Sequence, residues 1–146
     1  MRPTTAGMSP GTVVSVYYDA FSSLNHFLMD AIIQGADKRD VRAAANLYAV
    51  ARTRQAHEMS TNPPIIQAKA WRDAGGVLPA PDVFGVTDLV IEHLGGNDDD
   101  GMLTFRTHYY LWTPDEGYPR IRTDRLTLKR DRHGNWRIIE ILRTER

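Results

Sequence analysis

Hydrophobic residues recur at helical spacing in the first half of the chain and alternate with polar residues in the second half. In the first half, intervals of three or four residues place on one helical face Val14, Tyr17, Phe21, Leu24 and Leu28. Ser22-Ser23 divides this pattern, because serine favours helix ends over helix interiors. We therefore predict helices over about 10–23, starting at Ser9-Pro10, and over about 25–34, capped by Asn25.

Two further helical segments precede the strands. The first is capped by Asp37 or Asp40, has an alanine-rich stretch that permits close packing, and runs to about residue 59. Asn62-Pro63-Pro64 ends it, because a residue that precedes proline disfavours helical backbone. The second is a short helix or helical turn that we expect over 65–73.

Strand patterns fill the chain beyond Pro79-Ala80-Pro81. We predict four strands, over about 83–93, 102–112, 121–130 and 136–143, with a tight hairpin between the last two. Helices followed by strands that can pair with their sequence neighbours favour an α+β fold. In that fold the N-terminal helices pack on one antiparallel sheet of about four strands.

Composition narrows the class of protein. The 146 residues suit one domain, which we place at 9–146 after a flexible N-terminal segment over 1–8. The formal net charge is zero, with 18 basic and 18 acidic residues, which argues against a nucleic-acid partner. The charges are nevertheless segregated: 82–116 holds eight acidic residues and one Arg, and 120–146 holds nine basic residues and four acidic ones. Cysteine is absent, which excludes thiol nucleophiles, disulfides and thiolate metal sites.

We expect neither an export signal nor a membrane signal in the N-terminal residues of this sequence. Residues 1–9 contain one Arg and no apolar run, so we expect no signal peptide. No stretch approaches the roughly 18 apolar residues of a membrane span, so we expect no membrane span. The chain is expected to be soluble and cytoplasmic as given, and extracytoplasmic if it is a fragment of an exported parent.

Two stretches resemble a known family. The first stretch lies in the opening helix and reads Val13-Val14-Ser15-Val16-Tyr17-Tyr18-Asp19-Ala20-Phe21. The second closes the chain and reads Leu126-Thr127-Leu128-Lys129-Arg130-Asp131-Arg132-His133-Gly134-Asn135-Trp136-Arg137-Ile138-Ile139. Together with the order of elements, they resemble the NTF2-like superfamily, which contains the SnoaL-like and ketosteroid-isomerase-like domains. The short strand that members usually place between the second and third helices is not evident here.

The resemblance implies a specific architecture. The expected fold is a curved antiparallel sheet wrapped around the helices, with a conical pocket between them. It also implies a homodimer formed through the outer face of the sheet, or a domain of a larger parent protein. Enzymes of this kind place an acid, a base or a hydrogen-bond donor inside an apolar cone, where burial shifts pKa values.

Candidates for such chemistry are tyrosines and aspartates near the expected interior. Hydrogen bonds to a ligand oxyanion could come from Tyr17, Tyr48 and Tyr109. The candidate bases are Asp19, Asp30 and Asp88. The alternative is that the tyrosines belong to the core, with their hydroxyls satisfied at its rim.

A second constellation lies on the strand at 102–112. One of its faces carries Leu103, Phe105, Thr107, Tyr109 and Leu111, and the other carries Thr104, Arg106, His108, Tyr110 and Trp112. An Arg106-His108-Tyr110 face could hold a carboxylate or phosphate, with Arg122 and Asp124 expected across from it on the next strand. The alternative is an ordinary exposed or dimer-facing surface.

No group of polar residues converges on a nameable reaction. The five histidines show no metal-ligand spacing, so we expect no metal, and nothing in the sequence indicates a cofactor. We expect a non-catalytic NTF2-like module that binds a small hydrophobic or anionic ligand or takes part in assembly. The alternative is a SnoaL-like acid–base enzyme, an isomerase, hydratase or cyclase, that acts on a small hydrophobic substrate.

Overall fold

A computed structural model describes residues 7–35, 37–58, 65–114 and 116–146. Residues 1–6 of the flexible segment expected over 1–8, and the helix end expected at Asn62-Pro63-Pro64, lie outside these residues, whereas Met8 packs against the core. None of the described helices is both long enough and apolar enough to cross a membrane.

The three predicted N-terminal helices are confirmed. Helix α1 (Pro10–Ser22) begins where the Ser9 hydroxyl accepts a hydrogen bond of 3.3 Å from the Thr12 backbone N–H. Helix α2 (His26–Ile32) is capped by the Asn25 side chain, as predicted. Helix α3 (Arg39–Glu58) begins beside Asp37, whose carboxylate accepts a hydrogen bond of 2.9 Å from the Arg39 N–H.

The sheet has five strands, one more than predicted, and is mixed. Its order is β1-β2-β3-β4-β5, and the strands are β1 (Ile66–Gln67), β2 (Val83–Asn97), β3 (Met102–Trp112), β4 (Arg120–Arg130) and β5 (Trp136–Glu145). Strands β2 to β5 pair with their sequence neighbours in antiparallel fashion, as predicted, whereas β1 pairs with β2 in parallel. The expectation of a helix from residue 65 was therefore partly wrong, since α4 (Ala68–Asp73) begins only after β1. Two residues are too few to show a strand period.

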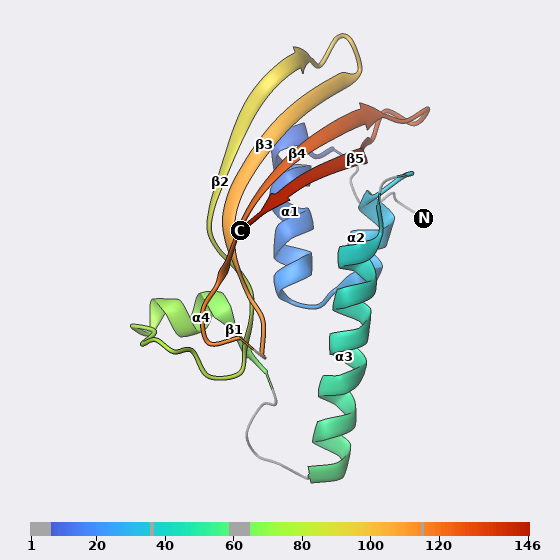
Figure 1. Ribbon diagram of the computed structural model, residues 1–146. Coiled ribbons are helices and arrows are strands. Elements are labelled where there is room, and N and C mark those ends of the chain that lie inside the picture. Colours follow the sequence, from blue (N-terminus) through green and yellow to red (C-terminus); the bar gives the residue numbers. More distant parts are fainter. Residues whose placement is uncertain (1–6, 36, 59–64, 115) are drawn as a thin grey trace.

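The sheet curves around α1, with α2 and α3 beside it, and α4 lies across the sheet from α1 (Figure 1). The core forms where α1 meets the concave face. Helix α1 contributes the fully buried Val13, Val14 and Phe21, and the strands contribute residues such as Leu126 and Ile138. Burying these apolar side chains is the main force that holds the helices on the sheet.

The two faces predicted for β3 are confirmed by burial. All five members of the Leu103 face are buried, whereas its opposite face is mostly exposed or half-buried. Trp112 is the exception on that second face, because α4 covers it. Its ring centroid lies 4.9 Å from that of Trp71, and its indole N–H donates a hydrogen bond of 2.8 Å to the Thr87 hydroxyl.

The segment between α2 and α3 meets the sheet at one point. Ile33 forms a single parallel bridge with Ile138 of β5, and the Gln34 N–H donates a hydrogen bond of 2.8 Å to the Ile138 carbonyl. This bridge covers part of the β5 edge, which would otherwise expose unpaired backbone groups.

Candidate functional site

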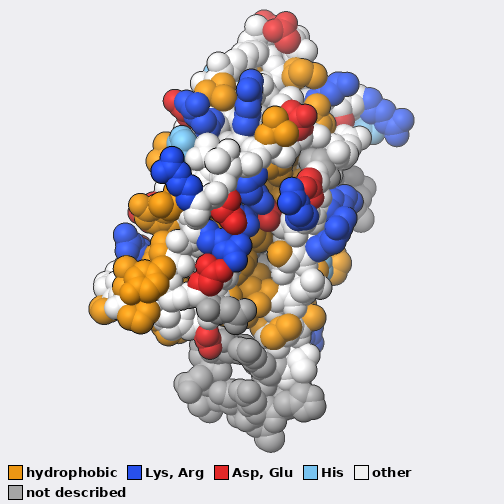
Figure 2. Space-filling model, in the orientation of Figure 1, with side chains coloured by type: hydrophobic (Ala, Val, Ile, Leu, Met, Phe, Trp, Pro, Cys, Tyr) orange, Lys and Arg blue, Asp and Glu red, His pale blue; other side chains and the backbone are white. Residues whose placement is uncertain are grey.

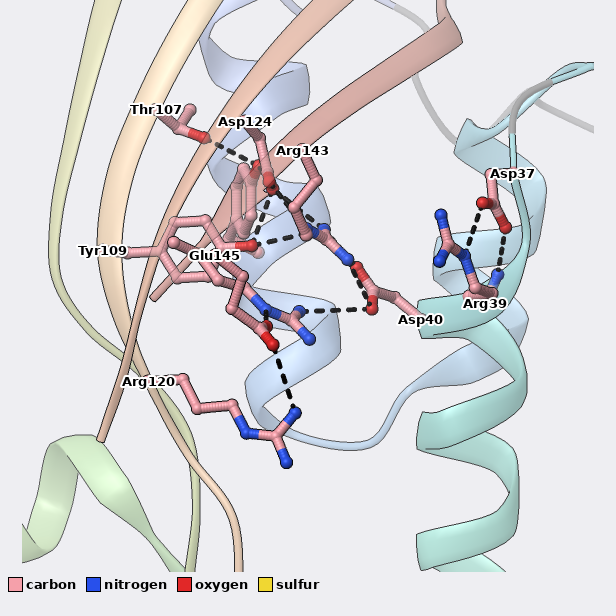
Figure 3. A network of polar contacts seen from close by, with 11 residues as sticks. Asp37, Arg39, Asp40, Thr107, Tyr109, Arg120, Asp124, Arg143 and Glu145 are labelled. Atoms are coloured by element: carbon pink, nitrogen blue, oxygen red, sulfur yellow. Dashed lines mark hydrogen bonds and ion pairs between the residues drawn. The ribbon is translucent and has the colours of Figure 1, made fainter. Parts of the chain in front are cut away.

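A buried carboxylate lies at the centre of the polar side chains between the helices and the sheet (Figure 3). Asp124 of β4 has no exposed surface. The hydroxyls of Tyr18 and Tyr109 donate hydrogen bonds of 2.7 and 2.6 Å to its Oδ2. Arg143 of β5 donates to both oxygens, at 2.7 Å from Nε to Oδ1 and 3.0 Å from Nη2 to Oδ2. Asp124 therefore accepts four hydrogen bonds, two of them from a cation.

The network continues from Arg143 to α3. Nη1 and Nη2 of Arg143 donate hydrogen bonds of 3.1 and 2.6 Å to the two oxygens of Asp40, a buried residue of the first turn of α3. Arg122 also donates to Asp40, at 3.3 Å, and pairs with Glu145. Arg120 extends the chain of charges to the surface through the same Glu145. We call these residues, with Tyr18, Tyr109 and Asp124, the interior network.

Sheet register explains why these groups meet. Arg122 and Asp124 lie four and two positions before the buried Leu126 on the same strand. They therefore share its face, which is the concave one. Asp124 stands directly opposite Thr107 on β3 and Arg143 on β5, so three strands present polar groups at one level. Tyr18 reaches this level from α1, and its hydroxyl lies 2.8 Å from that of Thr107.

Electrostatics hold these groups in fixed protonation states. Burial alone would raise the pKa of Asp124, but hydrogen bonds from Arg143, Tyr109 and Tyr18 hold it below the ordinary value. Burial is the main cause that raises the pKa of both Tyr18 and Tyr109, and the Asp124 charge adds to it in both; Tyr109 also raises the pKa of Tyr18. At neutral pH, Asp124 is thus an ionised acceptor and the two tyrosines are neutral donors.

Tyr17 is the unsatisfied neighbour of the network. Its side chain is fully buried, and its hydroxyl makes no hydrogen bond with any described residue. Burial foremost, and then the negative charge of Asp40, raise the pKa of Tyr17 well above its ordinary value. Tyr17 therefore stays neutral and brings no additional charge to the interior.

The interior network has little empty space at its Asp40–Arg143 end, whereas a second hollow of about 380 Å³ lies beside Tyr18, between α1, α4 and β2. The hollow lined by Asp40, Arg143, Ile141, Asp37 and Arg39 has a volume of about 10 Å³. That is roughly the room needed by one water molecule and far below the roughly 300 Å³ of a small-ligand pocket. At this end the polar groups thus contact one another instead of facing a chamber.

The six predicted site residues lie in three separate places. Tyr17 and Tyr109 are interior residues at the network. Tyr48 is 39% exposed on α3, where its hydroxyl accepts a hydrogen bond of 3.2 Å from Arg52. The outer face of β3 carries the other three, Arg106, His108 and Tyr110.

The expectation that Arg122 and Asp124 face the Arg106-His108-Tyr110 group was wrong. The register pairs Arg122 with Tyr109 and Asp124 with Thr107, and these four residues all lie on the concave face. Two residues that stand directly opposite each other on neighbouring strands point to the same face of the sheet. Arg122 and Asp124 therefore point to the face of Tyr109 and Thr107. The outer-face groups have other partners: Arg106 pairs with Glu92 at 2.7 Å, and His108 Nδ1 lies 2.9 Å from the Thr123 hydroxyl.

The candidate bases lie outside the interior. Asp19, Asp30 and Asp88 are all exposed, and Asp30 pairs with Lys38 at 2.8 Å. Sequence reasoning considered Asp40 only as a helix cap and did not assign Arg143 to the site. One sequence signal could have indicated the network. Two charged residues, Arg122 and Asp124, occupy the same strand face as Leu126 and Leu128.

Among the described residues, no group of three or more His, Asp or Glu side chains is arranged to hold a metal ion. Comparisons of the chain with protein-family models, with curated proteins and with solved structures find no match. Inference about its function therefore depends on its own residues.

Proposed function

We propose that this chain is a non-catalytic NTF2-like module that acts by binding or assembly. One observation carries the proposal: the ionisable groups between helices and sheet are paired with one another, and the hollow beside Asp40 and Arg143 holds only about 10 Å³. In this proposal the interior network is a structural clamp that fixes α1 and α3 on the sheet. Binding or assembly would then take place through the surface of the protein.

The chemistry of the network argues against acid–base catalysis. A general acid or base needs a pKa near the working pH and a substrate proton within hydrogen-bond reach. Asp124 is ionised, its pKa is lowered, and its oxygens are occupied by donors from three other residues. Arg143, bound to two carboxylates, has no unoccupied fork to present to an oxyanion.

The layout of the elements supports the NTF2-like assignment. Three helices precede an antiparallel meander, and the sheet curves around α1 (Figure 1). The bridge at Ile33 lies between α2 and α3, where members usually have a short strand.

Exposed apolar side chains on the outer sheet face support a homodimer as part of the proposal. Val90, Ile121 and Leu142 are 57, 47 and 54% exposed and come from three different strands. Exposed apolar side chains on one sheet face can contribute to a protein interface.

The first test measures catalysis. The purified protein is incubated with small hydrophobic enones and epoxides, and isomerisation and hydration are followed by absorbance and mass spectrometry. We expect no turnover above buffer. Turnover that disappears in a folded Asp124→Asn or Tyr17→Phe variant would overturn the proposal and favour the enzyme.

The second test measures assembly by sedimentation equilibrium. We expect the wild-type mass to correspond to two chains and Leu142→Asp to shift it toward one chain, because a buried unpaired charge weakens an interface. Asn46→Asp, an exposed change on α3, is the control and should leave the mass unchanged. A single-chain mass for the wild type at all concentrations would remove the homodimer from the proposal.

A further inference from the structure

A basic groove lies at the end of the molecule formed by the hairpin that joins β4 and β5. It has a volume of about 720 Å³ and runs between this hairpin and the residues that follow α2. Its basic lining residues are Lys129, Arg130, Arg132, His133 and Arg137. Figure 2 shows Lys and Arg side chains gathered at the upper right, over this hairpin. The volume lies in the range of small-molecule sites.

Two of the four Lys and Arg side chains are held by the protein itself. Arg137 donates to Asp131 at 3.1 Å and also to the Ala31 carbonyl. Arg130 stacks over the Trp136 ring at 4.9 Å and donates to the Asp98 carbonyl. These contacts fix the walls of the groove, so it is formed before any ligand arrives.

The other two cations have no acidic partner among the described residues. No ion pair joins Lys129 or Arg132 to a described Asp or Glu. Asp131, the acid that lines the groove, accepts hydrogen bonds from the backbone N–H groups of His133 and Asn135 and from Arg137. The Asp131 carboxylate is therefore satisfied by groups of its own hairpin. Within the described part of the chain, no acidic side chain therefore neutralises the charges of Lys129 and Arg132.

Apart from the polar Gln34, the rest of the lining is apolar. Ala31, Ile33 and Ile139 contribute hydrocarbon surface beside the cations. A matching ligand would carry a compact negative group and an apolar portion next to it. Because the whole chain has a net charge of zero, attraction of anions to this end reflects local placement and not an overall basic field.

We propose that this groove binds a phosphate monoester carried on an apolar group. Such a phosphate carries about −1.5 to −2 charges at neutral pH, which suits two cations better than a single carboxylate charge does. Lys129 and Arg132 would bind the phosphate oxygens, and Ile33 and Ile139 would contact the apolar group. This ligand class deepens the proposed binding function and rests on it.

The test uses phenyl phosphate as the probe, with the intact protein. Backbone amide shifts are followed by NMR while phenyl phosphate is added up to millimolar concentration. We expect saturable shifts at residues 129–133 and near Ile33. Lys129→Gln and Arg132→Gln should each weaken binding at least threefold, and the double variant at least tenfold. Arg125→Gln removes one exposed charge from the same strand outside the groove, and it should bind like the wild type.

Several outcomes would overturn the phosphate site. They are absence of saturable shifts, an equal loss in Arg125→Gln, or benzoate binding as tightly as phenyl phosphate. Vesicles of phosphatidylcholine with and without phosphatidic acid separate the two sources of the phosphate. Capture by phosphatidic acid assigns a lipid headgroup, and binding of the free ester alone assigns a soluble ligand. The catalytic and sedimentation tests do not use phosphate, so failure here is distinguishable from failure of the proposed function.

Discussion

Arg143 lies between Asp40 and Asp124, and its one guanidinium group binds both carboxylates. Nη2 is 2.6 Å from Asp40 Oδ2, and Nε is 2.7 Å from Asp124 Oδ1. Asp40 belongs to α3 and Asp124 to β4, so one side chain of β5 connects the helix layer to the sheet (Figure 3). Burial of a charge is costly unless it is paired, so each of the three groups depends on the other two.

Removal of Arg143 should be strongly destabilising. Arg143→Met keeps an unbranched apolar stem and leaves two buried carboxylates without their shared cation. We expect the free energy of unfolding to fall by about 3–5 kcal/mol, measured by urea denaturation followed by circular dichroism. Arg125→Met, on the exposed face of β4, is the control and should change it by less than about 0.5 kcal/mol. Equal effects of the two substitutions would show that the clamp contributes nothing.

Two adjacent tyrosines should respond differently to loss of their hydroxyls. Tyr18→Phe removes the donor of a 2.7 Å hydrogen bond to Asp124, so we expect a loss of about 1–3 kcal/mol. Tyr17→Phe removes a buried hydroxyl that has no hydrogen-bond partner among the described residues, so stability should stay unchanged or rise. Both variants are compared by urea denaturation. A loss for Tyr17→Phe as large as that for Tyr18→Phe would mean that its hydroxyl has a partner, such as a buried water.

Stability should decline on acidification, partly through Asp124. Its pKa in the folded protein lies below the ordinary value of about 3.9, so the folded state favours the ionised form. The resulting stability is fully present above that ordinary value and is lost as pH falls through the lower pKa of the folded state. Asp124→Asn lacks this titration. The difference in unfolding free energy between wild type and Asp124→Asn, measured from pH 7 to 2.5, should therefore shrink below about pH 4. A constant difference would contradict this assignment.

The sequence predicts the layers well because their signals are local. Periodicity and caps indicate α1 and α2, and strict alternation separates the two faces of β3. The interior network is harder to predict, because it depends on which residues of β3, β4 and β5 stand opposite one another. The period of β4 places Arg122 and Asp124 on the face of Leu126, but only the pairing with Thr107 and Arg143 shows which groups they meet there.

Other differences arise from tertiary contacts. Ile66 enters the sheet because it pairs with Val83, a residue 17 positions later, which no local period reveals. Strand pairing cancels only part of the charge difference between the acidic stretch at 82–116 and the basic stretch at 120–146. Glu92 does neutralise Arg106 across β2 and β3, but Lys129 and Arg132 have no such partner among the described residues.

Leu24 and Phe21 share the predicted hydrophobic stripe but should differ under mutation. Phe21 is 1% exposed and packs against Phe84, so Phe21→Ala should cost about 3–5 kcal/mol. Leu24 lies between α1 and α2 with φ of 60°, a left-handed conformation that is strained for a residue with a Cβ. Its side chain is only half-buried, so part of the apolar contribution is already absent.

The unusual backbone of Leu24 reverses the ordinary order of two substitutions. Leu24→Ala and Leu24→Gly both remove the apolar contact, but only glycine also relieves the left-handed strain. We therefore expect Leu24→Gly to be more stable than Leu24→Ala by about 1 kcal/mol. At Ala20, inside α1, glycine should instead be the less stable of the two by a similar amount, because it loses more conformational freedom on folding. Thermal and urea unfolding of these three variants and the wild type measure both differences. An Ala variant more stable than the Gly variant at position 24 would show that the turn between α1 and α2 does not hold the left-handed conformation in solution.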